Sequence, residues 1–189
     1  MTILNRKFYH RPTLEVAYDL LGKKLVRQRN GRELAGIIVE TEAYCGRKDS
    51  ACHAYRGRTL RNAVMFGPPG HAYVYFTYGM HYLLNLVTQD EGEPCAVLVR
   101  AIEPLSGLAE MQTRRKQQGK NLTNGPAKLC QALDIDKAYN GWDLTKGLQL
   151  WVEKNPNVQA GRIITTPRIG IDYADKKDRD ALWRFLLKP

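Results

Sequence analysis

Apolar positions near the start of the chain recur first at helical spacing and then at strand spacing. Between Pro12 and Gly22, where a helix would begin and end, the apolar face comprises Leu14, Ala17, Leu20 and Leu21. Two strand-like runs follow at 24–28 and 34–44, and Asn30-Gly31 separates them. Because an Asn-Gly pair favours a tight hairpin turn, this pattern predicts two antiparallel strands.

A second hairpin is indicated farther along, after a Gly- and Arg-rich stretch at 46–70. Aromatic and β-branched residues fill 72–78 and 82–87, and Gly79 separates the two runs. Alternation along the first run puts one set of side chains on a common face: Tyr73, Tyr75 and Thr77. Tyr78 would then lie next to the turn, where its ring can project from the molecule.

The second half of the chain mixes strands and helices without regular alternation. The patterns predict helices over 105–118 and 126–133, with Asn124-Gly125 capping the second helix and Pro126 in its first turn. Strands are expected over 95–102, 148–152, 162–165, 169–171 and 183–187. The predicted fold class is therefore α+β, not a parallel βαβ sheet. We expect a single domain over residues 1–189, with a mixed, mainly antiparallel, curved β-sheet, flanking helices and a protruding β-hairpin.

The composition is that of a globular protein with a large positive charge. Of 189 residues, 43% are hydrophobic and 25% are charged, which excludes a disordered chain, collagen and a coiled coil. Lys and Arg number 29 against 19 Asp and Glu, a net charge of +10. This excess favours a polyanionic partner, although ribosomal attachment, an anionic membrane surface or solubility alone would also fit.

The sequence also carries information about location. No apolar run is long enough to span a membrane, and residues 1–12 lack the apolar core of a secretion signal. The four cysteines are too few and too scattered for a disulfide scaffold. We therefore expect an intracellular protein, in the cytoplasm or nucleoid if it is bacterial.

Basic and aromatic side chains are concentrated in neighbouring parts of the chain. Basic residues gather in 46–61 and 114–128, and six of the ten tyrosines lie between Tyr44 and Tyr82. Either basic segment alone fits a solvated surface, and half of the tyrosines could belong to the core. Together they indicate a surface that follows a nucleic-acid backbone and stacks tyrosine rings on bases.

One predicted strand carries candidate catalytic groups. Alternation places two carboxylates and a tyrosine on one face with Ile38: Glu40, Glu42 and Tyr44. Arg100 interrupts the apolar strand at 95–102, and a buried guanidinium needs an anionic partner, which Glu42 or Glu40 could supply. The same pattern fits a solvent-facing sheet surface or a structural ion pair. The spacing alone therefore does not distinguish these two alternatives from a catalytic site.

Neither a metal nor a nucleotide cofactor is expected. Cys45, Cys52 and His53 lack the paired short spacing of zinc ligands, and no second Cys/His cluster follows them. No segment of the sequence resembles a phosphate-binding loop or a Gly-x-Gly-x-x-Gly turn.

Taken in order, these residues resemble the alkyladenine (3-methyladenine) DNA glycosylase family over nearly the whole chain. The blocks that carry the resemblance are 39–44 (VETEAY), His53, 61–66, 73–80, Asn85, 98–104 (LVRAIEP), 125–133 and 168–170. Each block is weakly specific by itself, but the ordered set is highly specific. The resemblance implies a monofunctional enzyme of base excision repair. Such an enzyme flips an alkylated or deaminated purine out of duplex DNA and hydrolyses its N-glycosidic bond, leaving an abasic site.

The resemblance also implies roles for individual residues. Glu42 would be the general base that activates water, and Arg100 would help to hold that water. The flipped base would be 3-methyladenine, 7-methylguanine, hypoxanthine or ethenoadenine. The residues expected to contact it are Tyr44, His53, Tyr75, Asn85 and Ile169. Tyr78 would enter the minor groove. The DNA backbone would contact Arg58, Thr59, Met65 and Lys128. The enzyme would be a monomer on double-stranded DNA, without a metal or other cofactor.

Physical chemistry agrees with these roles. A purine alkylated at N3 or N7 is cationic, so tyrosine rings attract it, and it leaves without prior protonation. Catalysis then needs a placed water, a carboxylate and exclusion of solvent. Two other classes of function stay open on the residues alone. These are a non-catalytic lesion-binding or architectural DNA-binding protein on the same scaffold, and an RNA- or ribosome-associated module.

Overall fold

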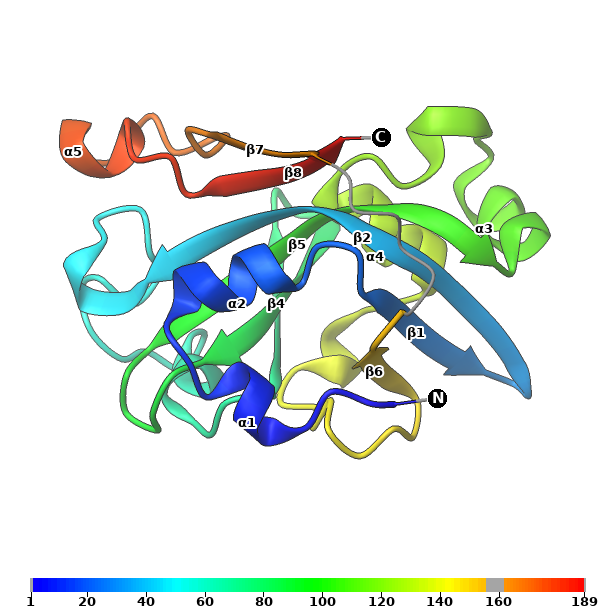
Figure 1. The fold of residues 1–189 in the computed structure, drawn as a ribbon, viewed down its shortest axis with the longest axis horizontal. Helices are drawn as coiled ribbons and strands as arrows, with labels where there is room; N and C mark the ends of the chain where they lie inside the picture. Colours follow the sequence, from blue (N-terminus) through cyan, green and yellow to red (C-terminus); the bar gives the residue numbers. More distant parts are fainter. Residues whose placement is uncertain (1, 156–161, 189) are drawn as a thin grey trace.

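The computed structural model describes residues 2–155 and 162–188. Within them, one antiparallel sheet has the strand order β3-β4-β5-β2-β1-β6, and β8 pairs with both β2 and β7 (Figure 1). The strands are β1 (Lys24–Arg29), β2 (Arg32–Cys45), β3 (Ala72–Thr77), β4 (His81–Thr88), β5 (Cys95–Ser106), β6 (Leu150–Glu153), β7 (Arg162–Thr166) and β8 (Arg184–Lys188). The long strand β2 organises the sheet, because it pairs with β1, β5 and β8.

Helices from both halves of the chain pack against this sheet (Figure 1). They are α1 (Arg6–Tyr9), α2 (Thr13–Asp19), α3 (Leu108–Arg115) and α4 (Pro126–Leu133). The short helix α5 (Lys176–Arg179) lies in the segment between β7 and β8. The main buried cluster joins Val16 and Ala17 of α2 and Leu129 and Leu133 of α4 to the central strands. The α+β fold class with a mainly antiparallel sheet is therefore confirmed, whereas the extent of the domain, 1–189, stays a prediction.

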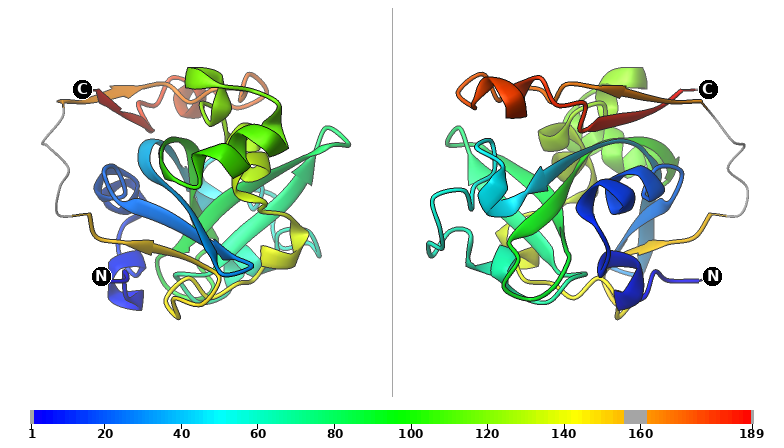
Figure 2. Two further views of the ribbon diagram at one scale, coloured as in Figure 1. Left: turned by 90° about the vertical axis from the view of Figure 1, so that its right-hand side faces the viewer. Right: turned by 60° about the vertical axis from the view of Figure 1, so that its left-hand side comes forward.

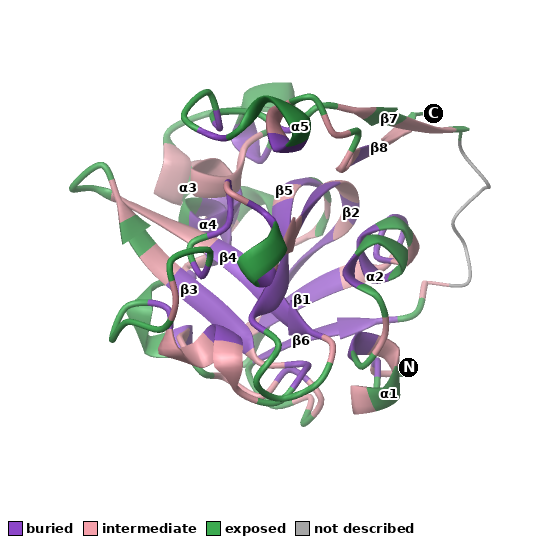
Figure 3. Ribbon diagram, turned by 90° about the vertical axis from the view of Figure 1, so that its left-hand side faces the viewer, coloured by how far each residue is buried: buried purple, intermediate pink, exposed green. Residues whose placement is uncertain are grey.

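Both predicted hairpins are present. Asn30 and Gly31 have φ angles of 48° and 75°, and Tyr78 and Gly79 have φ angles of 51° and 67°. Each turn thus has two central residues in the left-handed region, the type that matches the twist of the strands it joins. The β3–β4 hairpin projects from the body of the molecule (Figure 2), and its tip is exposed (Figure 3).

Three details of the sequence prediction are wrong. The helix expected at 105–118 shortens to α3, because β5 continues to Ser106 and pairs there with β2. Residues 169–171, predicted as a strand, lie in the segment between β7 and α5, outside any strand. Leu14 is 36% exposed, because the buried face of α2 comprises Thr13, Val16 and Ala17.

The alternation predicted along β2 also fails at one point. The pairing of β2 with β5 shifts register twice in succession, skipping Val39 on β2 and then Arg100 on β5. Each shift is a bulge, which re-aims the side chains around it. Ile38 consequently belongs to the main core, and the prediction that it shares a face with Glu40 and Glu42 is wrong. The bulges lie beside the carboxylates that the sequence singled out.

Candidate active site

A cavity of about 730 Å³ lies beside the end of β2, the β3–β4 hairpin and the segment after β7. All five residues expected to contact a flipped base line it: Tyr44, His53, Tyr75, Asn85 and Ile169. Arg100, Met65 and Tyr78 line it as well. These residues come from segments that are far apart in the chain, so the tertiary fold creates the cavity.

Aromatic rings form one wall of the cavity. The rings of His53 and Tyr75 meet edge to face with centroids 4.5 Å apart, and Tyr73 lies 5.4 Å from Tyr75. The Asn85 amide donates to the Tyr73 carbonyl oxygen at 3.2 Å, which fixes this amide in the wall. Partial desolvation of the ring, together with the charge of Arg61, lowers the pKa of His53 to about 4. The His53 ring is therefore neutral at pH 7.

The Glu42 carboxylate lies directly behind the cavity wall and is 0% exposed. Its Oε2 accepts hydrogen bonds from the Tyr44 hydroxyl at 2.8 Å and from Arg100 Nη1 at 3.2 Å. Its Oε1 accepts from the backbone N–H of Ile169 at 2.8 Å. All three donors belong to residues that line the cavity. Since a carboxylate has about four acceptor sites, one site on Oε1 is not taken by any described residue.

The two carboxylates considered as partners of Arg100 both contact it. Arg100 Nε is 3.0 Å from Glu40 Oε1, and Nη1 is 3.2 Å from Glu42 Oε2. The prediction of an anionic partner for this guanidinium is therefore confirmed. A solvent-facing sheet surface does not describe this pair, because the side chain of Glu42 is 0% exposed and that of Glu40 is 16% exposed.

A buried arginine, to which the sequence alone assigns no separate role, supports the same wall. The Arg168 guanidinium pairs with both oxygens of Asp49, at 2.6 and 2.9 Å, and both side chains are 0% exposed. Its central carbon lies 4.7 Å from the ring centroid of Tyr44 and 4.9 Å from that of Trp183. The sequence does not predict this pair, because Arg168 and Asp49 are 119 positions apart.

Two tyrosines stand at the mouth of the cavity. Tyr78, at the tip of the β3–β4 hairpin, is 86% exposed, and Tyr173 is 69% exposed. The Tyr173 hydroxyl donates to the Ala51 carbonyl oxygen at 3.0 Å, so this ring is tied to the opposite loop. The position of Tyr78 before Gly79 predicted that its ring projects beside the hairpin turn. Tyr173 was missed, because it lies in no periodic pattern.

The four predicted DNA-backbone positions differ in their surroundings. Arg58 and Thr59 are exposed in the loop before Asn62, whose amide Oδ1 accepts from the Thr59 backbone N–H at 2.6 Å. Lys128 is half-buried in α4 and donates to Asn124 at 2.8 Å. Met65 is 2% exposed, and its backbone N–H donates within its own turn. The side chain of Met65 therefore lies in the cavity wall and does not reach the surface.

The two basic segments also differ. Arg47, Lys48, Arg56 and Arg58 are exposed in the first segment, 46–61. In the second, 114–128, Arg114 is paired with Asp134 and Arg115 donates to the Leu122 carbonyl oxygen. The second segment thus presents fewer free cations to a polyanion than its composition indicates.

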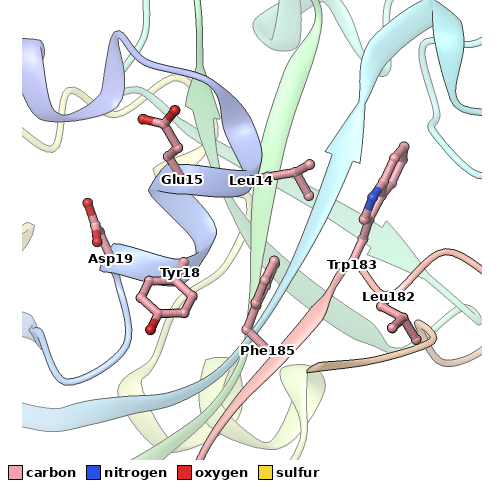
Figure 4. Close-up of a pocket in the computed structure, with 7 residues that line it drawn as sticks. All are labelled: Leu14, Glu15, Tyr18, Asp19, Leu182, Trp183 and Phe185. Atoms are coloured by element: carbon pink, nitrogen blue, oxygen red, sulfur yellow. The ribbon is translucent and has the colours of Figure 1, made fainter. Parts of the chain in front are cut away.

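A smaller groove of about 430 Å³ lies between α2 and β8 (Figure 4). Its lining is Leu14, Glu15, Tyr18, Asp19, Leu182, Trp183 and Phe185. Among the described residues that line it, two are acids and none is lysine or arginine, and one of the acids, Asp19, is paired with Arg11 at 2.8 Å. The groove therefore offers no cation of its own lining to a phosphate backbone. Candidate chemistry therefore lies in the larger cavity.

Two further features of the described residues bear on function. In 2–155 and 162–188, no group of three or more His, Cys, Asp and Glu side chains is arranged to hold a metal ion. Among the same residues, no helix is long and apolar enough to cross a membrane. An intracellular location stays a prediction.

Enzymes that act on one base of duplex DNA extrude that base into a pocket whose aromatic side chains stack on it. The cavity behind the projecting hairpin has the features of this class. Comparison with known proteins gives the family: the model of methylpurine-DNA glycosylases matches residues 7–189, and the chain belongs to this family. It is thus a DNA-repair hydrolase acting on N-glycosidic bonds.

Similar proteins cover almost the whole chain. A protein of Methanocella arvoryzae is 53% identical over 189 residues, 98% of this chain and 92% of its own length. One of Carboxydothermus hydrogenoformans is 53% identical over 187 residues, 98% and 95% of the two chains. One of Desulfitobacterium hafniense is 48% identical over 198 residues, 100% and 96%. Each is named "Putative 3-methyladenine DNA glycosylase".

Proposed function

We propose that this enzyme flips alkylated or deaminated purines out of double-stranded DNA and hydrolyses their N-glycosidic bonds with a water that Glu42 activates. The observation that carries the proposal is the position of Glu42, which lies behind the cavity wall with one acceptor site left on Oε1. Water bound there would attack C1′ of the deoxyribose. Glu42 would accept the proton of that water, and the base would leave with the electron pair of the broken bond. The product is an abasic site.

The cavity wall suits a cationic base. Purines alkylated at N3 or N7 carry a positive charge, and the faces of Tyr44 and Tyr75 attract cations. Because the pKa of His53 is lowered to about 4, the neutral His53 ring does not repel such a base at pH 7. A cationic alkylated base leaves as a neutral base without prior protonation, so for these lesions the proposed chemistry needs only the general base and the placed water. A neutral lesion such as hypoxanthine would in addition have to gain a proton as its bond to the sugar breaks.

Selectivity between damaged and normal bases would come from the deeper wall of the cavity and from Ile169. Asn85 is 5% exposed and its amide is held by the Tyr73 carbonyl oxygen. As in the rest of the family, we propose that this amide disfavours the 2-amino group of normal guanine. The accepted lesions would be 3-methyladenine, hypoxanthine, ethenoadenine and 7-methylguanine. 7-Methylguanine keeps the 2-amino group, but its positive charge makes it a better ligand for the tyrosine wall and a better leaving group than guanine.

Binding to DNA would use the exposed surface around the mouth. Tyr78 would fill the gap that the flipped base leaves, from the minor-groove side. Arg58 and Thr59 in the exposed loop, and Lys128 at the start of α4, would contact phosphates. Since Met65 is buried, its share in DNA contact would be to shape the cavity wall. The proposed active form is a monomer.

A panel of duplexes, each with one lesion, tests the proposed function. Under single turnover, the enzyme should convert the alkylated and deaminated purines into abasic sites, which hot alkali reveals as strand breaks. An undamaged duplex of the same sequence is the control. Tight binding to the lesions without abasic sites would instead indicate a lesion-binding protein. Equal affinity for single-stranded RNA and lesion duplex would indicate an RNA-associated module.

Replacing Tyr78 with Asn should weaken base flipping while stabilising the fold. A bulky residue at φ 51° is strained by roughly 1 kcal/mol, and Asn tolerates this region well. The melting temperature should therefore rise slightly. The flipped fraction, followed with a fluorescent base analogue beside the lesion, should fall because the wedge is lost.

The matched control for this variant is Tyr78→Phe, which retains the ring and should retain flipping. Since the two effects of Tyr78→Asn have opposite signs, a damaged fold would not explain them. An unchanged fluorescence signal in Tyr78→Asn would remove the wedge role.

A further inference from the structure

Glu40 lies between two guanidinium groups. Its Oε1 accepts from Arg100 Nε at 3.0 Å and from Arg184 Nε at 2.6 Å. Arg184 also donates from Nη1 to Thr166 Oγ1 at 3.3 Å, so β7 helps to fix it. The lining residues of the cavity include Arg100 but, among the described residues, neither Glu40 nor Arg184. An effect of these two side chains on the reaction would therefore pass through Arg100.

The bond to Glu40 determines which edge of Arg100 faces Glu42. A guanidinium and a carboxylate pair best through two parallel hydrogen bonds. Here Glu40 occupies Nε of Arg100, and the contact with Glu42 runs from Nη1 to Oε2 at 3.2 Å. Without Glu40, Arg100 would be free to bind both oxygens of Glu42. That arrangement would fill the acceptor site on Oε1 that the attacking water needs.

We propose that Glu40 and Arg184 are positioning residues that hold Arg100 against one oxygen of Glu42 and keep the other oxygen accessible to water. The inference rests on the proposed function of Glu42 as the general base. The pairing of strands builds this arrangement into the sheet. Arg184 is opposite Glu42 in the β2–β8 register, and the bulge at Arg100 re-aims that side chain.

Single-turnover excision of 7-methylguanine from a duplex at pH 7 tests this inference on the full chain. Glu40→Gln should lower the rate by about 10-fold, because the water site is filled. Arg184→Met should lower the rate in the same direction, because Glu40 loses a partner that fixes it. Arg184→Lys retains the charge and should recover most of the wild-type rate. Binding to an abasic-site duplex should be unchanged in all three variants.

Arg29→Met is the matched control, since Arg29 Nε is 2.6 Å from Asp134 in an ion pair outside the site. It should leave the rate unchanged. A wild-type rate in Glu40→Gln, or a loss of stability in Glu40→Gln and Arg184→Met without a loss of rate, would overturn the inference. Failure of the proposed function has a different signature, because Glu42→Gln would then excise at the wild-type rate.

Discussion

Replacing Glu42 with Gln is expected to abolish base excision while DNA binding persists. The amide has the size of the carboxylate but does not take a proton from water. The single-turnover rate should fall by about 10²–10⁴-fold, the range that a positioned general base contributes. Binding to an abasic-site duplex should be nearly unchanged, because Glu42 is 0% exposed and reaches the cavity only through its hydrogen-bond partners. Strand breakage in hot alkali measures the first quantity, and fluorescence anisotropy the second.

The matched control is Glu15→Gln, since Glu15 is exposed on α2 and lies outside the large cavity. This variant should excise at the wild-type rate. Normal excision by Glu42→Gln would contradict the assignment of the general base. If Glu42→Gln lost binding as well as rate, with a lowered melting temperature, the carboxylate would be a structural group and the proposed chemistry would need another base.

The elements that could be predicted from sequence have local causes. The turns at Asn30-Gly31 and Tyr78-Gly79 follow from backbone preferences of adjacent residues, and α4 follows from Pro126 and the apolar spacing after it. The carboxylate partner of Arg100 could also be predicted, because a guanidinium within an apolar strand requires one. The five base-pocket residues came from the family resemblance. The structure gathers them in one cavity, and their roles stay predictions.

The features that could not be predicted from the sequence depend on contacts between segments that are far apart in the chain. Alternation placed Ile38 beside the carboxylates, but a bulge depends on how β2 and β5 pair and has no signal in β2 alone. The apolar run at 169–171 resembled a strand. Its first backbone N–H instead binds Glu42, a partner 127 positions away. The pair of Arg168 and Asp49 was missed for the same reason.

Replacing Arg168 with Met should give the largest loss of stability among single changes near the site. The side chains of Arg168 and Asp49 are both 0% exposed, and the guanidinium also donates to the carbonyl oxygens of Ala43 and Asp178, at 2.9 and 3.1 Å. Met fills similar volume but leaves the Asp49 charge buried without its partner. Breaking a buried pair in this way costs about 3–5 kcal/mol. For a chain of this length, the melting temperature should fall by roughly 10 °C or more, measured by calorimetry.

A double variant separates the charge from the packing. Asp49→Asn in the Arg168→Met background removes the buried charge, so it should recover part of the lost stability, whereas independent sites would add their losses. Lys176→Met is the control, because the pair of Lys176 and Asp180 is exposed and should contribute little to stability. The guanidinium of Arg168 lies against the Tyr44 ring, so the double variant should also excise more slowly even where it is folded. Wild-type stability in Arg168→Met would show that the ion pair does not hold this wall in place.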